Sequence, residues 1–272
     1  MEIIKKYVSA LAKKVNFIAI TCFVMLSGFA IFGWASFRRN DSKTVVKKAP
    51  VESFYHSAKP DPVKIKLLSE VCNKMSLNQD ELFIEGIINA GNGADSTDRI
   101  EAADYIFSKK GEAFYYRLGQ VETINNDDLS IYVDHGIKKI MISAPKEYGA
   151  LPAIADVGNL LNRIEEEGYE LKEKVQGEST TLALTNPNHV SCKAYSVSFN
   201  TKTLQPEKIF CRMSNFQNPE DDKLDNQLEI TFKKIEKHSG IEKYPIQKYV
   251  QKEKGNWVLN AAFKEYELIN LL

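Results

Sequence analysis

Apolar residues recur at helical spacing in one segment that begins just after residue 60, and they predict an amphipathic helix there. The residues are Val63, Leu67, Leu68, Val71 and Met75. Positions three or four apart lie on one face of a helix, so we expect this face to pack on a core. Asp61 and Pro62 come directly before, as an N-cap and a first-turn proline, and place the start of the helix.

The pattern then changes to short runs rich in β-branched and aromatic residues, which predict strands. We expect strands at 82–88, 100–108, 113–118, 121–124, 129–133, 137–143, 171–176, 180–185, 190–199, 207–213, 228–235 and 263–269. Short turns such as Lys110-Gly111 and His135-Gly136 join neighbours, and short joints force antiparallel pairing. The glycines of the segment 89–93 are interpreted as a flexible hairpin loop between two of these strands.

A second helical stripe interrupts the strands. It consists of Ile154, Val157, Leu161 and Ile164, and Gly168 is expected to end it. The pattern as a whole contains about ten to twelve strands and two helices, without an internal repeat. A single domain over residues 62–272 accommodates them.

An uncharged run of 23 residues, from Val15 to Phe37, precedes this domain. As a helix it would be about 34 Å long, slightly more than the hydrocarbon core of a bilayer. The sequence therefore predicts a basic cytoplasmic tail at 1–14, a transmembrane helix at 15–37, a polar linker at 38–61 and an extracytoplasmic domain at 62–272. A cleaved export signal is the alternative, although the run exceeds the usual apolar core of such signals.

Charge is divided unevenly between these parts. Residues 1–50 hold nine Lys and Arg against two Asp and Glu, a net +7, whereas the rest holds 27 against 34, a net −7. Basic residues beside an apolar run suit the anionic headgroups of a lipid bilayer, so membrane lipid is one expected partner. The domain is acidic and so lacks the excess of basic residues that nucleic-acid binding requires. Long domains translocate largely regardless of flanking charge, which predicts a single-pass protein of the inner membrane with its domain in the periplasm.

The segment 195–209, YSVSFNTKTLQPEKI, contains an apolar strand, a polar turn and a Leu-x-Pro entry into the next strand. This hairpin resembles one that is common in the periplasmic lipoprotein-carrier (LolA/LolB-like) superfamily. The order of elements over about 63–272 is also similar. The resemblance implies a curved antiparallel half-barrel with helices in its concave face. The expected fold class is therefore α+β, an N-terminal transmembrane helix followed by a half-barrel-like antiparallel sheet with two packed helices.

Two cysteines flank that hairpin almost symmetrically. If the turn centres near Thr201 and Lys202, Cys192 and Cys211 face each other across antiparallel strands. Opposed residues can reach the Cβ separation of a disulfide. We interpret the pair as a disulfide in an oxidising compartment, with two independent buried thiols as the alternative.

Signatures of chemistry are absent from the sequence. The four histidines are widely separated, and no nucleophile elbow, phosphate loop or metal-spaced pair occurs. We therefore expect neither enzymatic activity nor a cofactor. Two functions compete: an anchored scaffold or accessory subunit that holds protein partners in an envelope assembly, and a domain that binds or transfers a lipid or acyl chain in a hydrophobic cavity.

The C-terminal end is unusually apolar, with Trp257, Phe263 and Tyr266 followed by two leucines. Chain ends normally fray, so this one is expected to be held. A closing strand of the sheet is the simpler interpretation, and a tail that docks onto a partner is the other.

Overall fold

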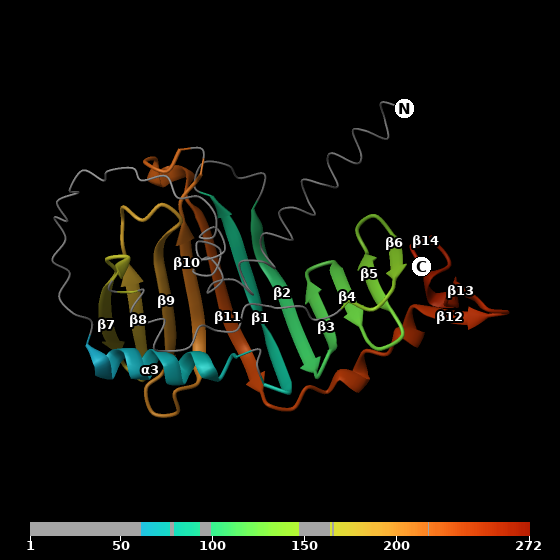
Figure 1. Ribbon diagram of the computed structural model, residues 1–272, viewed down its shortest axis with the longest axis horizontal. Helices are drawn as coiled ribbons and strands as arrows, with labels where there is room; N and C mark the ends of the chain where they lie inside the picture. The colour runs from blue at the N-terminus through green and yellow to red at the C-terminus, as the bar shows by residue number, and fades with distance from the viewer. Residues whose placement is uncertain (1–60, 77–78, 93–98, 147–163, 165, 217) are drawn as a thin grey trace, which may run out of the picture.

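The computed structural model describes residues 61–76, 79–92, 99–146, 164, 166–216 and 218–272. One curved sheet of twelve strands dominates it, in the order β14-β6-β5-β4-β3-β2-β1-β11-β10-β9-β8-β7. A separate hairpin, β12-β13, lies beside one end of this sheet (Figure 1). The strands are β1 Glu81–Asn92, β2 Ile100–Lys110, β3 Ala113–Leu118, β4 Val121–Asn125, β5 Ser130–Asp134, β6 Lys139–Ser143, β7 Glu170–Gln176, β8 Ser179–Thr185, β9 Cys192–Asn200, β10 Pro206–Met213, β11 Asn226–Glu236, β12 Val250–Glu253, β13 Asn256–Leu259 and β14 Glu267–Asn270.

Two antiparallel meanders make up the sheet. β1 to β6 form one and β7 to β11 form the other, and the long antiparallel pair between β1 and β11 joins them. The predicted hairpin turns are confirmed, because Lys110-Gly111 connects β2 to β3 and His135-Gly136 connects β5 to β6. Residues 89–92, in contrast, are not a hairpin loop, since they continue β1.

The predicted α+β class is wrong. Strands make up most of the described chain, and the only α-helix whose bounds it contains is α3, Pro62–Asn73. A helix of 12 residues covers only part of a twelve-stranded sheet, so it does not form a second layer. The sheet is also not wholly antiparallel, because β14 pairs parallel with β6. Over the described residues the fold is β-rich, with the short helix α3 on a curved sheet.

The transmembrane part of that prediction finds no support. The segment from Val15 to Phe37 lies outside the described residues. Within the part of the chain that is described, no helix is long and apolar enough to cross a bilayer.

Both helix boundaries that can be compared agree with the sequence. The Asp61 side chain accepts a hydrogen bond from the Val63 backbone N–H at 2.9 Å, and Pro62 opens α3. In the second helical segment Ile164 and Glu166 are helical, and Gly168 follows with φ of 70°. The remaining residues of that stripe, Ile154, Val157 and Leu161, lie outside the described residues.

Two hydrophobic cores lie on opposite faces of the sheet. The first, here called the helix-side core, contains the buried face of α3 packed on β1, β2 and β8 to β11. The second, the C-terminal core, packs β3 to β6 against the segment 241–268. Successive residues of a strand point to opposite faces. In β3, accordingly, Leu118 belongs to the helix-side core and Tyr115 to the C-terminal core.

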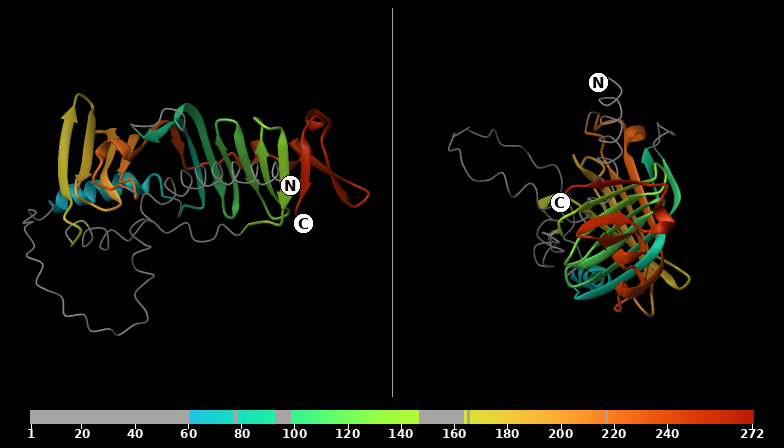
Figure 2. Two further views of the ribbon diagram at one scale, coloured as in Figure 1. Left: turned by 90° about the horizontal axis from the view of Figure 1, so that it is seen from above. Right: turned by 90° about the vertical axis from the view of Figure 1, so that its right-hand side faces the viewer.

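The C-terminal segment is held as a chain of short elements. It contains three 3₁₀ turns, η2 Ile241–Lys243, η3 Ile246–Lys248 and η4 Ala261–Phe263, in addition to the β12-β13 hairpin. β14 then closes the sheet beside β6, as Figure 2 also shows from the side of the C-terminus. The closing-strand interpretation is confirmed, although the sequence placed the strand at 263–269 and did not predict its parallel direction.

Candidate functional site

The two cysteines of the predicted disulfide lie close together in the helix-side core. Cys192 and Cys211 are buried, and their Sγ atoms are 3.7 Å apart. They are not directly opposite, because Cys192 pairs with Met213 and Cys211 with Tyr195 across a register shift. A hydrogen bond between the thiols lowers the pKa of Cys192 and raises that of Cys211 well above its usual value. Both are free thiols here, so the disulfide stays a prediction.

A third thiol lies in the same core. Cys72 on α3 is buried, and desolvation raises the pKa of its thiol to about 12, which keeps it protonated and unreactive. Cys72 is therefore a core residue of α3.

An apolar strip continues the face of the sheet that carries α3. Registered pairs link Tyr116 to Thr123, Thr123 to Tyr132, Tyr132 to Met141 and Met141 to Ile269, so these five residues form one row across β3, β4, β5, β6 and β14. The row starts at the helix-side core, since the rings of Tyr116 and Tyr105 pack edge to face with centroids 5.7 Å apart.

All five members of this apolar strip are half-buried, and none carries a charge. Adjacent strands are about 4.8 Å apart, so a row across five strands extends for about 19 Å. The C-terminal core cannot cover the strip, because it lies on the other face. The arrangement offers a half-exposed apolar surface that is continuous with a packed core.

A buried carboxylate organises the C-terminal core. The Glu122 carboxylate accepts hydrogen bonds from the hydroxyls of Tyr115, at 3.1 Å, and Tyr249. His135 Nε2 lies 2.8 Å from its other oxygen, and His135 Nδ1 lies 2.8 Å from the Tyr266 hydroxyl. Burial raises the pKa of Glu122, but the hydrogen bonds from Tyr249 and His135 outweigh it and hold this pKa below its usual value.

This Glu122 network was missed by the sequence analysis. A signal was present in the sequence, because Glu122 lies two residues before Ile124 and therefore on the same buried face of β4. Buried carboxylates are rare unless they are paired. Its partners are 7, 13 and 127 residues away in the chain, and no local pattern reveals the most distant of them, Tyr249. The network ties β3, β4 and the turn between β5 and β6 to the C-terminal segment, and we interpret it as structural.

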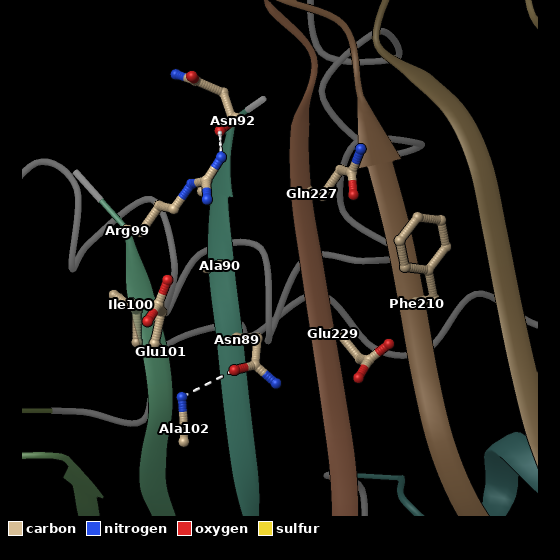
Figure 3. A pocket seen from close by; sticks show the side chains of 11 residues that line it. Asn89, Ala90, Asn92, Arg99, Ile100, Glu101, Ala102, Phe210, Gln227 and Glu229 are labelled. Carbon is tan, nitrogen blue, oxygen red and sulfur yellow. Dashed lines mark hydrogen bonds between the residues drawn. The ribbon is translucent and has the colours of Figure 1, made fainter. Parts of the chain in front are cut away.

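A polar cavity of about 550 Å³ opens on the face opposite α3, where β1, β2, β10 and β11 lie side by side (Figure 3). Its wall includes the Phe210 ring and the amides of Asn89 and Gln227. Its charged members are Arg99, Glu101 and Glu229.

An irregularity in β1 and β2 shapes this cavity. The register shifts between Ile88 and Ala90, and the Asn89 side chain accepts a hydrogen bond from the Ala102 backbone N–H at 2.8 Å. At Gly91 an added Cβ would lie 2.7 Å from Arg99 Cγ, so the glycine allows the arginine to approach the strand. Bulges of this kind commonly re-aim side chains near binding sites.

The histidines do not gather into a site. His135 joins the Glu122 network, His189 lies 3.2 Å from Glu167, and His238 lies 3.2 Å from Glu81. His56 lies outside the described residues. In the described ranges no group of three His, Cys, Asp or Glu side chains could hold a metal ion.

Comparison with known proteins gives weak likenesses of fold only. No family model matches the chain. No curated protein matches it either. Among solved structures, an uncharacterised conserved protein from Thermus thermophilus matches with a TM-score of 0.36 and 8% identity over 76% of this chain and 99% of that one. A LolA superfamily protein from Nitrosomonas europaea has a TM-score of 0.24 and 11% identity, over 63% of this chain and 91% of that one.

A putative outer membrane lipoprotein-sorting protein domain from Vibrio parahaemolyticus matches with a TM-score of 0.24 and 8% identity, again over 63% and 91% of the two chains. The LolA-like resemblance expected from the hairpin at 195–209 is thus confirmed as a weak resemblance of fold. At such scores and identities no residue role transfers to this chain.

Proposed function

We propose that this protein is a non-enzymatic binding protein of the cell envelope, and that the apolar strip holds an acyl chain of a lipid or lipoprotein. The observation that carries the proposal is the strip itself, five uncharged and half-buried residues in register, continuous with the helix-side core. A contiguous exposed apolar patch commonly marks a binding surface, whereas apolar residues that are scattered singly over the surface do not.

The shape of the strip favours an extended ligand over a compact one. It is one residue wide along each strand and crosses five strands, which suits a hydrocarbon chain laid across the sheet. As part of the same proposal, the β-rich domain lies in the periplasm, where the carriers that the hairpin resembles operate.

The test compares two arginine substitutions in the full-length protein. Met141 is the β6 member of the strip and lies between Tyr132 and Ile269. Ile137 is 46% exposed in the turn before β6 and lies outside the strip. Burying a methionine-sized apolar contact contributes about 1.5–3 kcal/mol, so Met141→Arg should weaken binding of cis-parinaric acid by about tenfold or more. Ile137→Arg should leave the affinity unchanged.

Native mass spectrometry of the purified protein gives an independent readout, in which co-purified lipid is expected in the parent and reduced in Met141→Arg. Unchanged fatty-acid affinity in Met141→Arg, or the absence of any saturable binding by the parent, would contradict the proposal.

A scaffold that holds protein partners is the second candidate, and strand β7 favours it. β7 is an edge strand of the sheet. Its sequence is ELKEKVQ, and most of its residues are exposed. Exposed edges can accept a strand from another protein. Alternating charges, however, commonly protect an edge from such pairing, and this strand carries four of them. Binding of an acyl chain on the apolar strip is therefore the favoured function of the two.

A further inference from the structure

The face of the sheet opposite α3 carries a second cavity near the first. It has a volume of about 370 Å³ and is lined by Lys174, Thr181, Ser198, Glu207, Lys208 and others of β7 to β11. Its members alternate with residues of the helix-side core, for example Thr181 with Leu182 and Ser198 with Val197, so they point away from α3. Both cavities therefore open on one face.

One ion pair lies between the two cavities. Lys208 lines the second cavity and Glu229 lines the first, and their charged atoms are 3.1 Å apart. Phe210 is directly paired with Glu229, and Lys208 with Thr231, so the two cavities share the β10-β11 pair. We call these two cavities, which flank the ion pair on one face of the sheet, the polar groove; their lining residues come from strands β2 to β7 in the order of the sheet.

The charges of the polar groove balance. Arg99, Lys174 and Lys208 supply three positive charges, and Glu101, Glu207 and Glu229 supply three negative ones. An anionic polymer such as a nucleic acid would need a basic excess, and a basic peptide would need an acidic one. The balance favours an uncharged ligand.

The chemical groups of the groove favour a polyhydroxylated ligand. The wall offers an aromatic ring at Phe210, amides at Asn89 and Gln227, and hydroxyls such as those of Thr181 and Ser198, which bond each other at 2.8 Å. Amides and hydroxyls both donate and accept, as sugar hydroxyls do, and an aromatic ring can pack on the apolar face of a sugar ring.

The position of the groove disfavours a peptide. Peptides that bind sheets usually pair with the backbone of an edge strand. The groove reaches the edge strand β7 only through Lys174 and Gln176, and its other strands, β8, β9, β10, β11, β1 and β2, are each paired on both sides. A ligand there meets side chains, so recognition depends on the groups described above.

We propose that the polar groove binds an uncharged oligosaccharide, with Phe210 packed on one sugar ring and the Lys208–Glu229 pair lying between two subsites. This site is on the face opposite the apolar strip and does not depend on the acyl-binding proposal. Two neighbouring cavities on one face, with one ion pair between them, predict that a tetramer binds more tightly than a monomer.

The experiment is calorimetric titration of the full chain with an N-acetylglucosamine tetramer, the corresponding monomer, the cationic glucosamine tetramer and a neutral Gly-Ser peptide of similar length. The neutral tetramer should bind at least tenfold more tightly than the monomer. Phe210→Ala should weaken tetramer binding by at least tenfold, because the ring contact is lost.

Phe216→Ala is the matched control, since Phe216 is 82% exposed in the loop after β10 and outside both cavities. It should leave the affinity unchanged. Thermal unfolding of Phe210→Ala should match the parent, which separates lost binding from lost folding.

Four outcomes would overturn the proposal: no saturable binding of the neutral tetramer, equal weakening by the two phenylalanine variants, binding of the cationic tetramer alone, or binding of the peptide in place of the sugar. Fatty-acid affinity should be the same in Phe210→Ala as in the parent. The sugar-binding and the acyl-binding proposals can therefore be refuted independently of each other.

Discussion

The half of the sheet under α3 and the half under the C-terminal segment are stabilised by different interactions. The helix-side core is built from aliphatic and aromatic side chains and three thiols. The C-terminal core surrounds a buried carboxylate with hydroxyls of tyrosines and a histidine. An apolar core tolerates approximate partners, whereas a buried carboxylate is stable only if its particular partners are in place. The β14 end of the sheet is therefore held by a specific polar network, whereas the α3 end is held by apolar packing.

The largest expected effect is on the helix-side core. Leu68 of α3 is 1% exposed, and its truncation to alanine should lower the free energy of unfolding by about 2–5 kcal/mol. Val63→Ala on the same helix is the control, since Val63 is 73% exposed. Chemical denaturation measures both. A small effect of Leu68→Ala would show that α3 is not needed to stabilise its half of the sheet.

The second-largest change in the free energy of unfolding is expected from the pair Cys192 and Cys211. If Cys192 and Cys211 form a disulfide in the oxidised protein, the bond closes a loop for which chain entropy gives about 3 kcal/mol. Reduction should lower the unfolding free energy by that amount in the parent and leave Cys192→Ala unaffected. Equal masses after alkylation under reducing and non-reducing conditions would establish that the two thiols are independent.

The Glu122 network is expected to have a smaller and more local effect. Glu122→Gln keeps the size but weakens the hydrogen bonds from Tyr249 and His135, which should cost about 1–3 kcal/mol. Hydrogen exchange should accelerate first in β12, β13 and β14, and β8 to β10 should be spared. Uniform acceleration over the whole sheet would mean that the two cores are not separable.

The same carboxylate predicts a pH dependence. Since the folded-state pKa of Glu122 is lowered, its contribution to stability is complete above the ordinary glutamate pKa and is lost as pH falls through the lower folded value. Acid titration of stability should therefore be less steep in Glu122→Gln than in the parent. An identical slope in the two proteins would show that protonation of Glu122 does not contribute to acid unfolding.

Local elements were predictable because local signals specify them. Asp61 and Pro62 set the start of α3 through a cap and a fixed φ, and Gly111 and Gly136 lie in the turns that the strand pattern required. The candidate sites were less predictable. Phe210, Gln227 and Asn89 meet only because β1 pairs with β11 over a separation of about 140 residues, and no turn or period encodes that pair.

Local sequence is enough to specify the helix cap, the hairpins of the two meanders and the closeness of Cys192 to Cys211, since each depends on residues near one another in the chain. The tertiary structure alone decided the predominance of strands, the two cores on opposite faces, the parallel closure by β14, the apolar strip and the polar groove. Alternation says that a strand has two faces, but it does not say which element will cover each. That choice depends on which distant segment buries the most apolar surface and satisfies the buried polar groups.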